Sequence, residues 1–116
     1  DKDDLENALA DFEIFIELTP DSAWAYDRRG EALVDYGEIE QGIEDFTTAV
    51  EINPEYDPAF VHRGRAYTDL GEFENALSDF DKAIQINPQN SDAYAGRGVV
   101  FYTQGKLTES LAEFTT

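Results

Sequence analysis

Apolar residues recur at three- and four-residue intervals, in segments that proline or glycine separates. That spacing places the apolar side chains of a segment on one face of a helix. In residues 1–19 these positions are held by Leu5, Ala8, Leu9, Phe12, Phe15 and Ile16. Six more such segments follow. Pro20, Pro54 and Pro88 mark the ends of segments, and Gly37, Gly71 and Gly105 mark turns between them. The sequence therefore predicts seven helices.

The residues that separate the helices repeat every 34 positions, and the pair Arg29-Gly30 returns as Arg63-Gly64 and Arg97-Gly98. A period of this length indicates an array of helical hairpins, each of which buries its apolar face against its neighbours. We predict a single domain over residues 1–116. It consists of the second helix of a preceding repeat (1–22), two full repeats (23–56 and 57–90) and an incomplete repeat (91–116). Because the chain opens in mid-pattern without an initiator Met, we expect it to be part of a longer protein.

The middle unit carries a recognisable motif, made of Phe60, Gly64, Tyr67, Ala76, Phe80 and Pro88. This pattern resembles the tetratricopeptide repeat. The first full unit offers Tyr26, Gly30, Leu33, Gly42, Phe46 and Pro54, and the last offers Tyr94, Gly98, Phe101, Ser110 and Phe114. The resemblance implies an all-α, right-handed α-solenoid of antiparallel helix-turn-helix repeats. The chain departs from the family at Arg29, Arg63 and Arg97, where Leu is usual.

The repeated residues have predicted structural roles. We expect Gly30, Gly64 and Gly98 where the two helices of a unit cross, because a side chain there would push the backbones apart. We expect the arginines of the Arg-Gly pairs to form ion pairs with carboxylates on the paired helices. Those carboxylates are Asp45, Asp79 and Glu113.

The chain is strongly acidic, with 26 Asp and Glu residues against eight Lys and Arg and a net charge of -18. Such a charge repels nucleic acid and anionic membrane surfaces, so we expect neither as a partner. The net charge is -7 in residues 1–22, -7 in 23–56, -3 in 57–90 and -1 in 91–116. A basic partner would therefore be steered to the N-terminal half, although a well-solvated surface is the simpler interpretation of the acidity.

The sequence favours no catalytic or metal chemistry. His62 is the only histidine, and a single helical histidine is more often a surface or partner-contact residue than a general base. The chain has no cysteine, which excludes disulfides and thiolate zinc sites. The acids in residues 1–4 lack the glycine of a calcium loop, and no phosphate-binding glycine loop is present. We expect no enzyme, no cofactor and no metal.

Binding residues are sought among positions that the framework does not require. In the first helix of each unit, the second, fifth, ninth, twelfth and thirteenth places lie on a face rotated away from the packed one. By resemblance to tetratricopeptide proteins, this concave wall is a groove for another protein, as an extended peptide or a partner helix. The candidate protein-binding residues are Trp24, Asp27, Glu31, Asp35, Val61, Arg65, Thr68, Asp69, Ala95, Val99 and Tyr102.

The composition of this wall predicts which partner fits it. Trp24 and Tyr102 are aromatics that the fold does not need, and such residues often anchor interfaces, although single exposed aromatics are also common. Family members that bind chaperone C-terminal carboxylates do so with Lys, Asn and Arg. Asp27 and Glu31 hold corresponding places here, so we expect a basic partner and no binding of chaperone tails.

The alternative function is structural self-association. The first predicted helix has more apolar residues than one face needs, and the last unit ends soon after Phe114. Solenoids normally end in helices with a polar outer face. Open ends would favour a homo-oligomer formed through the terminal helices.

Overall fold

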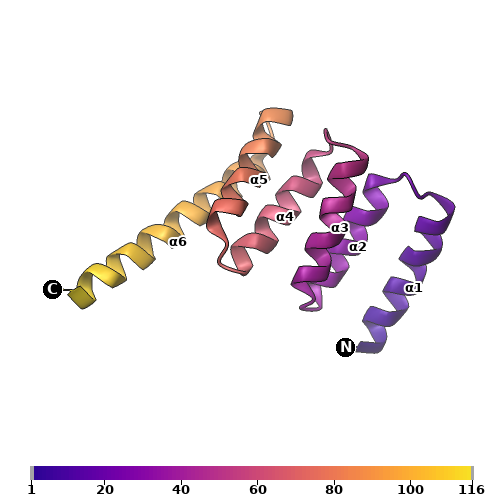
Figure 1. Ribbon diagram of the computed structural model, residues 1–116, viewed down its shortest axis with the longest axis horizontal. Coiled ribbons are helices and arrows are strands. Elements are labelled where there is room, and N and C mark those ends of the chain that lie inside the picture. The colour runs from indigo at the N-terminus through magenta and orange to yellow at the C-terminus, as the bar shows by residue number, and fades with distance from the viewer. Residues whose placement is uncertain (1, 116) are drawn as a thin grey trace.

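The computed structural model describes the backbone of residues 2–115 and the side chains of residues 2–107. It contains six α-helices: α1 (Lys2–Leu18), α2 (Ala23–Asp35), α3 (Ile39–Ile52), α4 (Asp57–Asp69), α5 (Phe73–Ile86) and α6 (Ser91–Thr115). No strand occurs in this part of the chain. The helices follow one another in a row from α1 to α6, and the far half of α6 projects beyond the others (Figure 1). The prediction of an all-α fold is confirmed.

The two sides of the row of helices differ in their contacts. Each helix contacts the next one along the chain, and α2 also contacts α4, as α4 contacts α6. Within the described residues, the backbones of α1 and α3 do not come close to each other, and neither do those of α3 and α5. Because only α2, α4 and α6 touch across a repeat, they share one side of the row. We call the surface formed by these three helices the inner face.

Local chemistry explains where the first helices begin and end. The hydroxyl of Ser22 accepts a hydrogen bond from the Ala25 N–H (3.2 Å) and caps α2. At the end of α2, Gly37 adopts a positive φ of 89°, and the Glu38 N–H donates to the Leu33 carbonyl (2.8 Å). Gly71, with φ of 78°, makes the same turn after α4. Such left-handed turns satisfy the last carbonyls of a helix and favour glycine.

The prediction of seven helices is wrong, because α6 runs unbroken through Gly105, where a turn was expected. A glycine inside a helix costs only about 1 kcal/mol relative to alanine, so a turn there depends on the packing of the two helices that it joins. Gly98, expected at that crossing, has no heavy atom within 4 Å of an added Cβ. Among the described residues no side chain packs on Gly98, which agrees with a continuous helix. The side chains of Ser110, Leu111, Glu113 and Phe114 lie outside those described.

Phe46 and Phe80 form the centre of the packing, and each side chain is 1% exposed. A Cβ added to Gly30 would stand 2.6 Å from the ring of Phe46, and one added to Gly64 would stand 2.8 Å from the ring of Phe80. The predicted steric role of these two glycines is therefore confirmed. Each ring also contacts the following repeat: Phe46 lies 5.7 Å from the His62 ring, and a Cβ at Gly96 would meet Phe80 at 2.4 Å.

The arginines of the Arg-Gly pairs connect neighbouring helices. Arg29 donates two hydrogen bonds to Asp45, both of 2.8 Å, and Arg63 donates two to Asp79, of 2.9 and 2.7 Å. These two predicted pairs are confirmed. Arg63 also donates to the Thr47 hydroxyl of the preceding helix (3.1 Å). The third predicted partner, Glu113, lies outside the described side chains, and Arg97 donates to Asp81 of α5 (3.0 Å).

Candidate functional site

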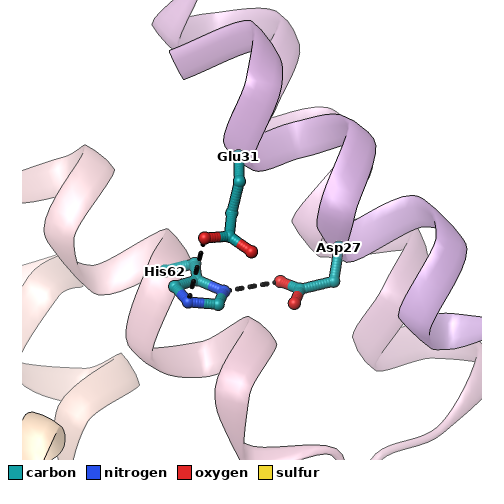
Figure 2. Close-up of side chains that lie close together, drawn as sticks. All are labelled: Asp27, Glu31 and His62. Carbon is teal, nitrogen blue, oxygen red and sulfur yellow. Dashed lines mark hydrogen bonds and ion pairs between the residues drawn. The ribbon is translucent and has the colours of Figure 1, made fainter. Parts of the chain in front are cut away.

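Three ionisable side chains meet on the inner face, between α2 and α4. Asp27 and Glu31 stand four residues apart, so they project from the same side of α2, and His62 of α4 lies between their carboxylates (Figure 2). His62 Nδ1 is 2.7 Å from Asp27 Oδ1, and His62 Nε2 is 3.6 Å from Glu31 Oε2. The Asp27 side chain is 2% exposed, whereas those of His62 and Glu31 are 21% and 34% exposed. We call these residues the His62 cluster.

The surroundings of the ring favour its protonated form. Burial acts to lower the pKa of His62, but the hydrogen bond to Asp27 and the negative charges of Asp27 and Glu31 raise that pKa above its ordinary value. The positive charge of Arg65 acts in the opposite direction. Because a carboxylate only accepts hydrogen bonds, the Asp27 contact places a proton on Nδ1 in both the neutral and the charged ring.

A cleft of about 120 Å³ opens beside the His62 cluster. It is lined by Glu31, Val34, Asp35, Phe46, His62, Arg65 and Ala66. Phe46 and Ala66 are buried, while Asp35 and Arg65 are exposed. The cleft thus has an apolar floor and a charged rim with two carboxylates and one guanidinium. Such a site suits a side chain that carries a positive charge at the end of an apolar stem.

The structure places the predicted binding residues in different environments. Exposed positions are held by Trp24, Asp35, Arg65, Asp69, Ala95, Val99 and Tyr102, and partly exposed ones by Glu31 and Thr68. Asp27 is buried against His62, and Val61 is 2% exposed within the core around Phe80. The 120 Å³ cleft brings Glu31, Asp35 and Arg65 together, but none of the other predicted residues lines it.

The two aromatic residues predicted as anchors are accessible and far apart in the row of helices. The Trp24 ring is 49% exposed, with Phe15 of α1 at 5.5 Å and the Arg28 guanidinium at 5.8 Å. The Tyr102 ring on α6 is 66% exposed, with the Lys106 ammonium group at 5.2 Å. Trp24 is therefore partly covered by its own chain, and Tyr102 is the more open of the two.

Sequence reasoning did not place His62 in the site. The ring stands at the sixth place of its repeat, whereas Asp27 stands at the fifth place of the preceding one. The contact could have been predicted from these places, because the first helices of successive repeats touch on the inner face. A residue at the sixth place of one repeat can therefore meet a residue at the fifth place of the repeat before it. Gly96 holds the corresponding place in the next repeat, so the cluster exists at only one of these junctions.

No helix in the described part of the chain combines the length and the apolar composition needed to cross a membrane.

Comparison with known proteins identifies the same helical repeat that the structure shows. Models of the tetratricopeptide repeat match residues 25–56 and 64–105. No curated protein sequence matches the chain significantly. Among solved structures, the tetratricopeptide domain of Arabidopsis OM64 is 24% identical, with a TM-score of 0.81 over 88% of this chain and 84% of that one.

Two further structures are similar. MamA is 27% identical, with a TM-score of 0.79, and the match covers 96% of this chain but only 65% of the MamA chain. The second tetratricopeptide domain of human RPAP3, solved with the HSP70 peptide SGPTIEEVD, is 25% identical, with a TM-score of 0.77 over 85% of this chain and 82% of that one. Together with the repeat matches and the row of helical hairpins, these likenesses show that the chain belongs to the tetratricopeptide repeat family.

Proposed function

We propose that this chain is a non-catalytic protein-interaction scaffold whose inner face binds an extended peptide or a partner helix that carries basic side chains. The observation that carries the proposal is the cleft between α2 and α4. Its rim presents the carboxylates of Glu31 and Asp35 above the buried ring of Phe46. A lysine or arginine of the partner would place its apolar stem over that floor and its charge at the rim.

The distribution of charge supports a basic partner. Residues 1–56 contain 17 acidic and three basic residues, so the N-terminal half attracts cations over a distance comparable to the Debye length. In the peptide of the human RPAP3 complex, SGPTIEEVD, three of the last four residues are acidic. Asp27, Glu31 and Asp35 would repel such a sequence. We therefore expect this chain to discriminate against acidic tails.

Peptide binding is measured with three fluorescein-labelled peptides of equal length, carrying four arginines, four serines or four glutamates. Fluorescence anisotropy at 50 and 300 mM NaCl gives each affinity. The arginine peptide is expected to bind most tightly and to weaken at the higher salt concentration, because its contacts are charged. Equal binding of the glutamate peptide, or insensitivity to salt, would contradict the proposal.

Paired variants locate the binding surface. Glu31→Gln combined with Asp35→Asn removes both carboxylates from the rim, and we expect the affinity for the arginine peptide to fall about tenfold, or about 1.4 kcal/mol. The control combines Glu74→Gln with Asp81→Asn, which removes the same charge from exposed positions on α5. Equal losses in the two pairs would show that only the total charge matters and that the cleft is not the binding site.

Self-association is the second candidate function, and the exposed apolar residues favour it. Ten large apolar side chains are exposed in the described part of the chain, three of them on α1 and five on α6. A hollow of about 520 Å³ also lies between α1 and the α2–α3 hairpin, lined in part by Leu5, Leu9 and Leu33. Sedimentation velocity at increasing concentrations tests this candidate. A constant monomer mass up to several hundred micromolar would exclude it.

A further inference from the structure

The His62 cluster is arranged in a way that peptide binding does not require. Asp27 is almost completely buried, and its only side-chain ion-pair partner among the described residues is the His62 ring. Its hydrogen bond fixes Nδ1 as the donor, so the lone pair of the neutral ring resides on Nε2. Nε2 lies on the Glu31 side of the cluster (Figure 2). In the neutral ring, an imidazole lone pair on Nε2 thus approaches a Glu31 carboxylate oxygen. A metal ion that binds there must displace the Nε2 proton, whose presence the raised pKa of His62 favours.

The separation of these two atoms fits a bridging cation. Zinc binds nitrogen and oxygen ligands at about 2.0–2.2 Å, and a tetrahedral angle at the metal then separates the two ligand atoms by roughly 3.4 Å. The observed distance from Nε2 to Glu31 Oε2 is 3.6 Å. Ligand atoms of all three residues lie within 4.8 Å of one another. The observed distance between the two atoms is thus close to the tetrahedral separation, and the Glu31 side chain is partly exposed.

Asp27 has the role that carboxylates often have behind a metal-binding histidine. A hydrogen bond from the distal ring nitrogen to a carboxylate fixes the tautomer and makes the opposite nitrogen a stronger ligand. The 2.7 Å contact from His62 Nδ1 to Asp27 Oδ1 has this form. Because Asp27 is held inside the fold, the ring is oriented before any ligand arrives.

We propose that His62 Nε2 and Glu31 bind a divalent transition-metal ion, with Zn²⁺ as the best match, at the mouth of the cleft between α2 and α4. Imidazole and carboxylate together suit zinc, and a site with two protein ligands leaves its other positions to water. Asp27 and Asp35 add negative charge near the ion, whereas Arg65 opposes it. The Arg65 guanidinium is 51% exposed and lies 3.6 Å from Asp92 of α6, so part of its charge is engaged away from the cluster.

This inference does not depend on the proposed peptide binding, although the two share Glu31. A bound metal would cancel the charge of Glu31 and change the rim of the cleft. Zinc binding is therefore measured without any peptide, and its failure leaves the peptide proposal unaffected. Failure of the peptide assay would likewise leave the metal site standing.

The test uses ZnCl₂ and the fact that the chain has a single histidine. At pH 7.5 the protein is titrated with Zn²⁺ by isothermal calorimetry, and the ring proton signals of His62 are followed by NMR. We expect one Zn²⁺ per chain and a shift of the His62 signals that saturates at that ratio. Binding to the acidic surface alone would give several weak sites and leave the His62 signals in place, which would overturn the proposal.

Substitutions separate the ligands from the acidic surroundings. His62→Gln and Glu31→Gln are each expected to weaken Zn²⁺ binding at least tenfold. Asp27→Asn should weaken it 10- to 100-fold, as loss of an outer carboxylate typically does. Glu74→Gln removes an exposed acid from α5, and its affinity should stay within twofold of the original. Equal affinity in the original chain and His62→Gln would refute the proposal. If His62→Gln fails to fold by circular dichroism, Glu31→Gln and the NMR titration decide the question.

Discussion

Replacement of Arg63 by alanine tests whether the arginine pairs hold the repeats together. Arg63 donates two hydrogen bonds to Asp79 and one to Thr47, so it connects α4 to both α5 and α3. The Asp79 side chain is only 6% exposed. Loss of the guanidinium would leave that carboxylate buried without a counter-charge. Breaking a buried pair in this way typically costs 3–5 kcal/mol, and we expect Arg63→Ala to lose about that much.

Arg97 offers a matched control in the next repeat. It holds the equivalent position, but its partner Asp81 has a side chain that is 57% exposed, so water solvates the acid when the arginine is removed. Exposed pairs contribute about 0–1 kcal/mol, so Arg97→Ala should cost less than 1 kcal/mol. The free energy of unfolding is measured by urea titration with circular dichroism at pH 7. If Arg63→Ala costs no more than Arg97→Ala, the pair has no structural importance.

Two further measurements test whether the unpaired Asp79 carboxylate causes the loss of stability in Arg63→Ala. Burial already raises the pKa of Asp79, while the hydrogen bond and charge of Arg63 hold it down. Without Arg63 the pKa rises further, so the deficit of Arg63→Ala should shrink as the pH falls and the carboxyl becomes protonated. Arg63→Leu combined with Asp79→Leu removes both charges and should recover most of the lost stability. A deficit that does not change with pH would point to lost packing instead.

Three other predictions concern stability. Phe80→Ala should lose about 3–5 kcal/mol of unfolding free energy in the same urea assay, because the ring is 1% exposed; a loss below 1 kcal/mol would contradict the packing. Gly71→Ala should lose about 1–2 kcal/mol because Gly71 has a positive φ, whereas Gly105→Ala should be neutral or stabilising because Gly105 is helical. In EDTA, the stabilisation due to His62 should be complete below its unfolded pKa of about 6.5 and should be lost as the pH rises through the raised folded value. His62→Gln should remove this dependence, and an unchanged pH profile in that variant would refute the assignment.

The sequence predicted the parts of the fold that recur within each hairpin. Gly30 and Phe46 are neighbours because the two helices of one repeat cross at that point, and the 34-residue period identifies both. The Arg29–Asp45 pair follows for the same reason. These contacts depend on local geometry and need only the two helices of one unit.

Contacts that depend on a particular neighbour were not predictable from the period. Val61 holds the place equivalent to Asp27, yet it lies in the core with Phe80, and Gly96 holds the place equivalent to His62. Asp27 instead meets the bulky polar ring of His62. The missing turn at Gly105 has a similar origin, since a glycine is compatible with a turn or a helix and the packing of other helices decides between them.

The double role of the buried phenylalanine rings has a consequence for how the molecule unfolds. Phe46 touches Gly30 in its own hairpin and His62 in the next, while Phe80 does the same with Gly64 and Gly96. A hairpin cannot detach without uncovering a ring on which its neighbour also relies. Denaturation is therefore expected to spread through both junctions that these rings bridge in a single cooperative step, and isolated repeats cut from this chain would not retain their structure.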